Sequence, residues 1–201
     1  MTITAFWWNA CGLFLCLLWI AQRFVPRGWK PTALAAGIAA LISIVPFFGH
    51  VPRFWLSGLT PNISVPLFAL LVFSVAGRMG CSPFFRPRDQ RAAFLFGALS
   101  ALALYPSALG LGFPGLDAHA LGWPWLEWDR SVLLFGVVAA AAGFLVWRGN
   151  RFGWVLVAAS LVYLLRIQES GNFWDYIVDP LYAVLSLVAT IKMSIDRLRG
   201  R

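Results

Sequence analysis

The stretch SVLLFGVVAAAAGFLVWRGNR, residues 131–151, contains the pattern that decides the fold. Residues 131–147 are uncharged and mostly apolar, and Arg148 and Arg151 follow directly. Six further apolar segments lie along the chain, at 3–22, 32–49, 62–77, 92–112, 152–169 and 173–191. A helix needs about 20 mostly apolar residues to cross the hydrocarbon of a bilayer, and a backbone in lipid must satisfy its own hydrogen bonds. The sequence therefore predicts an all-α, polytopic membrane protein, a bundle of about seven transmembrane helices forming a single domain over residues 1–201.

The composition agrees with a membrane domain. Hydrophobic residues make up 60% of the chain and charged residues only 12%, whereas soluble domains carry about 25% charged residues. The net charge of +8 does not indicate nucleic-acid binding, because the basic residues gather in a few short connections. Positive connections of this kind are typical of membrane topology and of contact with anionic lipid headgroups. We expect membrane lipids, and no nucleic acid, among the partners.

The basic residues occupy alternate connections between the apolar segments. Thirteen of the 16 Lys and Arg residues follow the first, third, fifth and seventh segments: Arg23, Arg27, Lys30, Arg78, Arg86, Arg88, Arg91, Arg148, Arg151, Lys192, Arg197, Arg199 and Arg201. Cytoplasmic loops carry the excess of Lys and Arg. This pattern predicts an N-terminus outside and a C-terminus in the cytoplasm, in a multi-pass protein of the bacterial cytoplasmic (inner) membrane.

Two segments are rich in small residues. The second contains the run 33–40, and the fifth contains Gly136, the alanines 139–142 and Gly143. Small residues allow helix backbones to approach closely in lipid. We expect both helices to pack inside the bundle or against a partner, which would be a larger membrane protein or a second copy of the chain.

Two outer connections have unusual compositions. Residues 51–62 include Arg53, Phe54, Trp55 and Leu56, which is apolar for a loop and suggests a segment in the headgroup zone. Residues 112–130 hold three tryptophans together with Asp117, His119, Glu127 and Asp129. A connection this long in a compact fold is often functional. These three carboxylates and the histidine are candidates for binding a ligand or a partner.

The connection before the last helix contains the strongest candidate site. If that helix begins near Asn172, then Asn172, Asp175, Asp179 and Tyr182 share one face. A carboxylate near the outer boundary of the hydrocarbon is costly and indicates a functional site. Pro180 would free the carbonyl of Tyr176 in such a helix. In the simpler alternative, Asp179 is the N-cap of a helix that starts at Pro180.

Arg166 is the natural partner for Asp179, because an Arg–Asp pair reduces the cost of placing both charges there. This pair would either clamp the last two helices together or bind a phosphate or carboxylate of a substrate. The candidate binding residues of this region are Arg166, Glu169, Asn172, Trp174, Asp175 and Asp179. No spacing of histidines, cysteines or carboxylates predicts a metal site, and no motif indicates a cofactor.

The expected function follows from these features. No catalytic motif such as GxSxG or HExxH is present in the sequence. We expect a small accessory subunit of a bacterial envelope assembly that handles lipid or polysaccharide, with an extracytoplasmic face that binds a ligand or partner. One alternative is a membrane enzyme acting on a lipid-linked substrate, with Asp175 or Asp179 as general base and Arg166 holding an oxyanion. Another is a proton- or cation-coupled transporter that uses Asp179.

Overall fold

The computed structural model describes residues 3–46, 48–59, 62–108, 111, 119–122, 128–168 and 170–200. Within them the fold is all-α, as predicted. The helices are α1 (Ile3–Ala21), α2 (Trp29–Ile44), α3 (Pro52–Leu59), α4 (Val65–Arg78), α5 (Pro87–Ala108), the 3-10 helix η1 (His119–Gly122), α6 (Trp128–Trp147), α7 (Phe152–Leu164), α8 (Trp174–Ile177) and α9 (Pro180–Leu198). Each expected apolar segment corresponds to one of the long helices, although several boundaries differ.

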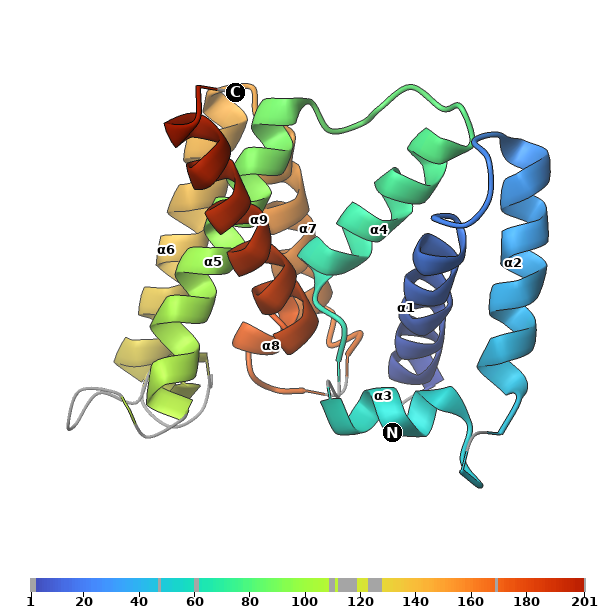
Figure 1. The fold of residues 1–201 in the computed structure, drawn as a ribbon. Coiled ribbons are helices and arrows are strands. Elements are labelled where there is room, and N and C mark those ends of the chain that lie inside the picture. The colour runs from blue at the N-terminus through green and yellow to red at the C-terminus, as the bar shows by residue number, and fades with distance from the viewer. Residues whose placement is uncertain are drawn as a thin grey trace.

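The long helices form a bundle that has two groups (Figure 1). In one group α5 packs along α9 and α6 packs along α7, while in the other α1 packs against α2 and α4. The helix α4 joins the groups through its contacts with α7 and α9. Large buried side chains at this junction include Leu67, Phe152, Leu156 and Tyr182.

Close helix packing depends on small residues at two positions. A Cβ atom on Gly97 of α5 would collide with the Ser186 Oγ and the Tyr182 ring of α9. A Cβ atom on Gly153 of α7 would lie 2.8 Å from the carbonyl oxygen of Ala142 in α6. These glycines therefore allow the two helix pairs to approach closely.

The connections between helices alternate between two ends of the bundle (Figure 1). The N-terminus, α3 and α8 lie at one end, which we call the α3 end. The C-terminus and the connections α1–α2, α4–α5 and α6–α7 lie at the opposite end, which we call the C-terminal end. The basic connections all belong to the C-terminal end. This is the arrangement that the charge pattern requires.

The number of membrane spans is not established by helix length. Within the described ranges only α1 is both long and apolar enough to cross a membrane. A helix of this kind near the N-terminus is found both in single-span proteins and in signal sequences. The helices α2, α4 and α7, and residues 133–147 of α6, are apolar but shorter. Seven spans therefore remain a prediction.

The helices that contain the small-residue runs, α2 and α6, lie at the two edges of the bundle rather than inside it (Figure 1). Each packs through one face, on which Ala35 and Ala39 of α2 and Ala142 of α6 are buried. Some of their small residues face outward. A Cβ atom added to Gly37, Gly136 or Gly143 would have no neighbouring atom within 4 Å. Of the two expected alternatives, packing inside the bundle or against a partner, this edge position favours the second, which remains a prediction.

Candidate functional site

The last helix begins at Pro180, with Asp179 as its N-cap. The Oδ1 atom of Asp179 accepts a hydrogen bond from the backbone N–H of Tyr182 at 2.9 Å. Val178 is extended, at φ −149° and ψ 132°, and separates α9 from the short helix α8. The prediction of one continuous helical face from Asn172 to Tyr182 is therefore wrong. Because Pro180 occupies the first turn, where its missing N–H costs nothing, it frees no helical carbonyl at Tyr176.

The second carboxylate oxygen of Asp179 joins α9 to α4. Its Oδ2 accepts a hydrogen bond from the backbone N–H of Ser64 at 2.8 Å, and Ser64 is itself the N-cap of α4. A single carboxylate thus serves two helix starts, where the unpaired N–H groups favour a negative charge. Asp179 is only 2% exposed. Burial raises the pKa of Asp179, which lies outside the helix α9, and hydrogen bonds from Ser64 and Tyr182 partly offset this effect.

Buried hydrogen bonds continue from Ser64 into the connection between α7 and α8. The carbonyl oxygen of Ile63 accepts from Gln168 Nε2 at 2.9 Å and from Trp8 Nε1 at 2.8 Å. The Tyr176 hydroxyl donates to the carbonyl oxygen of Ser170 at 2.9 Å. Burial raises the pKa of Tyr176 to about 12, so this hydroxyl remains a donor at neutral pH. Together with Asp179 and Ser64, these residues form what we call the Asp179 network.

The candidates Asn172 and Trp174 are both buried beside this network. The Asn172 Oδ1 accepts from the backbone N–H of Trp174 at 3.0 Å, and a Cβ atom on Gly122 would collide with Asn172. The Phe173 N–H donates to the Gly122 carbonyl at 2.9 Å. Asn172 and Trp174 thus help to hold η1 against the start of α8.

The remaining candidates lie apart from Asp179 or outside the described residues. Arg166 is exposed and has a positive φ of 50°, whereas backbone amides engage both oxygens of the buried Asp179. The expected Arg166–Asp179 clamp is thus replaced by contacts between Asp179 and the backbone. Asp175 is half-buried. Asp117, Glu127 and Glu169 lie outside the described residues, as do the side chains of His119 and Asp129.

Sequence reasoning did not identify Ser64 as a partner of Asp179. A signal was present, because Ser64 precedes Pro66 much as Asp179 precedes Pro180, and Ser or Asp followed by Pro is typical of a helix start. That both starts share one carboxylate depends on the approach of segments 115 residues apart. No local pattern contains this information.

A second buried carboxylate lies at the C-terminal end. Asp89 is fully buried, and its Oδ2 accepts from the backbone N–H of Arg86 at 2.9 Å in the manner of a capping box. Its Oδ1 accepts from the N–H of Arg151 at 3.3 Å. Arg88 Nη2 donates to the Gly149 carbonyl at 2.6 Å. These bonds hold the α4–α5 connection against the α6–α7 connection, so Arg88 and Arg151, two of the basic residues at this end, have a structural role.

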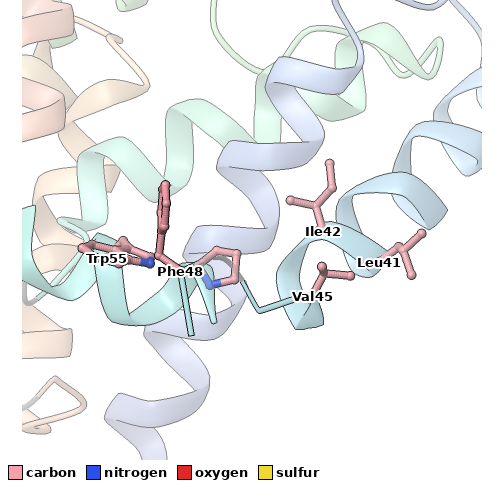
Figure 2. A pocket seen from close by; sticks show the side chains of 6 residues that line it. Leu41, Ile42, Val45, Phe48 and Trp55 are labelled. Carbon is pink, nitrogen blue, oxygen red and sulfur yellow. The ribbon is translucent and has the colours of Figure 1, made fainter. Parts of the chain in front are cut away.

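The α3 end carries an apolar cavity of about 710 Å³. Figure 2 shows its lining, which comes from Leu41, Ile42 and Val45 of α2 and from Phe48, Pro52 and Trp55 at or near α3. The helix α3 runs across the end of α1 and α2 (Figure 1), and Phe54 and Trp55 on it are 53% and 46% exposed. This is the orientation of a helix that lies in a headgroup zone. That location remains a prediction.

Among the residues that the structure describes, no group of three or more His, Cys, Asp or Glu side chains could hold a metal ion. His50 instead stacks on Phe54, with ring centroids 4.0 Å apart. Comparison of the chain with protein-family models, with curated proteins and with solved structures found no match. The proposals below therefore depend on the sequence and on the geometry of the described residues.

Proposed function

We propose that the chain is a small multi-pass protein of the bacterial inner membrane and an accessory subunit of an assembly that handles envelope lipid or polysaccharide. In this proposal the α3 end faces outward and the C-terminal end faces the cytoplasm. Support comes from the alternation of connections between the two ends, combined with the confinement of basic connections to one of them.

The observation that carries the accessory role is the exposed small-residue face of α6. Gly136 and Gly143 are two helical turns apart and would accept Cβ atoms without contact. Large apolar side chains border them, with Leu133, Val137 and Phe144 each more than half exposed. A face of this kind permits close approach of another transmembrane helix. Its partner would be a larger membrane protein or a second copy of the chain.

The geometry supports a catalytic role less well. A general base must reach the proton that it abstracts, whereas Asp179 is buried and both its oxygens already accept backbone hydrogen bonds. Of the two proposed bases, only Asp175 is partly exposed. The same engagement of Asp179 argues against its use as a proton carrier in transport.

The test is co-purification of the chain from its native membrane, followed by native mass spectrometry. The Gly136→Leu/Gly143→Leu variant should lose the partner, because two bulky side chains would hold the helices apart. The control Gly77→Leu adds a side chain at an equally open position of α4 and should retain it. A wild-type chain that is monomeric in chemically crosslinked membranes would contradict the proposal.

A further inference from the structure

A groove opens at the C-terminal end where α4 and α9 diverge. Its volume is about 440 Å³, within the range of about 300–1,000 Å³ that small-molecule sites occupy. Figure 1 shows the α4–α5 connection passing between the ends of α4 and α5 at this side of the molecule. The lining is mostly apolar and comes from α1, α4, the α4–α5 connection, α5 and α9. Its members on α4 and α9 include Leu67, Leu70, Leu71, Leu185, Val188 and Ala189.

Two cations line the same groove. Arg23 follows α1, and Lys192 lies in the last two turns of α9. The Arg23 guanidinium carbon lies 4.4 Å from the centre of the Trp19 ring, which holds the side chain at the groove. Within the described part of the chain, neither cation forms an ion pair with a carboxylate. Two uncompensated positive charges thus accompany an apolar groove.

Ring stacking and hydrogen bonds hold the side chains that line the groove in place. The rings of Phe73 and Phe84 stack at 4.0 Å between centroids, and the Phe84 carbonyl accepts from Arg151 Nη1 at 2.5 Å. On the other side Trp19 Nε1 donates to Ser74 Oγ at 3.0 Å. These contacts hold α1, α4 and the α4–α5 connection in place. The groove is therefore largely formed before anything binds.

We propose that this groove binds one anionic phospholipid. An acyl chain would lie along the leucines of α4 and α9, and the phosphate would accept hydrogen bonds from Arg23 and Lys192. Basic pockets between membrane helices on the cytoplasmic side recognise such headgroups. The groove is also open to the outside along α9, where Val188 is 61% exposed, so a chain could enter sideways from a bilayer. The inference depends on the membrane location that we proposed above.

The probe is phosphatidylglycerol, with phosphatidylcholine as the zwitterionic reference, added to the full chain in a neutral detergent and counted by native mass spectrometry. A Lys or Arg near an anionic lipid contributes about 1 kcal/mol, which is roughly five-fold in Kd. The Arg23→Gln/Lys192→Gln variant should thus bind phosphatidylglycerol about thirty-fold more weakly than wild type. The control Arg27→Gln/Arg199→Gln removes the same charge from the same end and should bind as wild type does.

A second variant tests the apolar part of the groove. Leu70→Trp fills the groove without changing any charge, and it should abolish the phosphatidylglycerol adduct. Equal binding of both lipids by wild type, or equal losses in the two double variants, would overturn the proposal. Extraction of membranes with alkaline carbonate distinguishes failure of this inference from failure of the proposed function. A chain that carbonate releases refutes the membrane location, whereas a retained chain without selective binding refutes only the groove.

Discussion

At the scale of single residues, Asp179 is the position whose role differs most from expectation. The sequence predicts that placing this carboxylate away from water is energetically costly and indicates a functional site. The burial of the carboxylate agrees with the energetic cost. Its charge, however, is engaged by the backbone amides of Ser64 and Tyr182 at the starts of α4 and α9 rather than by Arg166 or by an open cavity. The simpler alternative, a helix N-cap, is therefore the correct one.

Replacement of Asp179 should destabilise the fold. In Asp179→Ala the N–H groups of Ser64 and Tyr182 lose their acceptors, and a buried unpaired group costs about 1–3 kcal/mol. Asp179→Asn should cost less, because its single amide oxygen can still accept one of the two hydrogen bonds. Thermal unfolding in detergent measures both effects.

The control for this series is Asp196→Asn, which removes a partly exposed carboxylate near the other end of α9. It should unfold at the wild-type temperature. If Asp179→Ala also unfolded at the wild-type temperature, the network would contribute nothing to stability. Asp179 would then be available again as a functional candidate.

At the scale of elements, the apolar segments were predictable because long runs without charge are unambiguous. The residues at which each helix begins and ends were less predictable. The segment 173–191 divides into α8 and α9 because Asp179–Pro180 starts a new helix, and capping chemistry of this kind outweighs the periodicity of Asn172, Asp175 and Asp179. The predicted segment 152–169 forms the helix α7, which already ends at Leu164.

Gly97 tests the contact between α5 and α9. In Gly97→Ala the new methyl group would meet the Tyr182 ring at 2.7 Å, and Tyr182 is fixed by the hydrogen bond from its hydroxyl to the Ala93 carbonyl at 2.5 Å. Overpacking of this kind costs about 1–3 kcal/mol. We expect a lower unfolding temperature in detergent.

The matched control is Gly77→Ala in α4, where the added methyl group meets nothing within 4 Å. Alanine favours a helix over glycine by about 1 kcal/mol, so this variant should be as stable as wild type or slightly more so. Equal stability of Gly97→Ala and Gly77→Ala would show that α5 and α9 do not pack as closely as described.

At the scale of the whole molecule, the natural cysteines offer a test of the topology. Cys81 is exposed in the α4–α5 connection, which belongs to the C-terminal end. In intact cells a membrane-impermeant maleimide should not label Cys81, whereas permeabilised cells should give full labelling. In the converse variant Cys81→Ser/Gly171→Cys, the new thiol lies in the α7–α8 connection and should react in intact cells. The reverse result for both positions would invert the proposed orientation.

The shared carboxylate of Asp179 has a consequence for biogenesis. Synthesis proceeds from the N-terminus, so α4 is made well before Asp179, which accepts the N–H of its N-cap residue Ser64 and lies 115 positions further along the chain. Until α9 arrives, the Ser64 amide lacks its buried acceptor. Full stabilisation of the start of a middle helix is therefore delayed until the last helix has been synthesised and has docked.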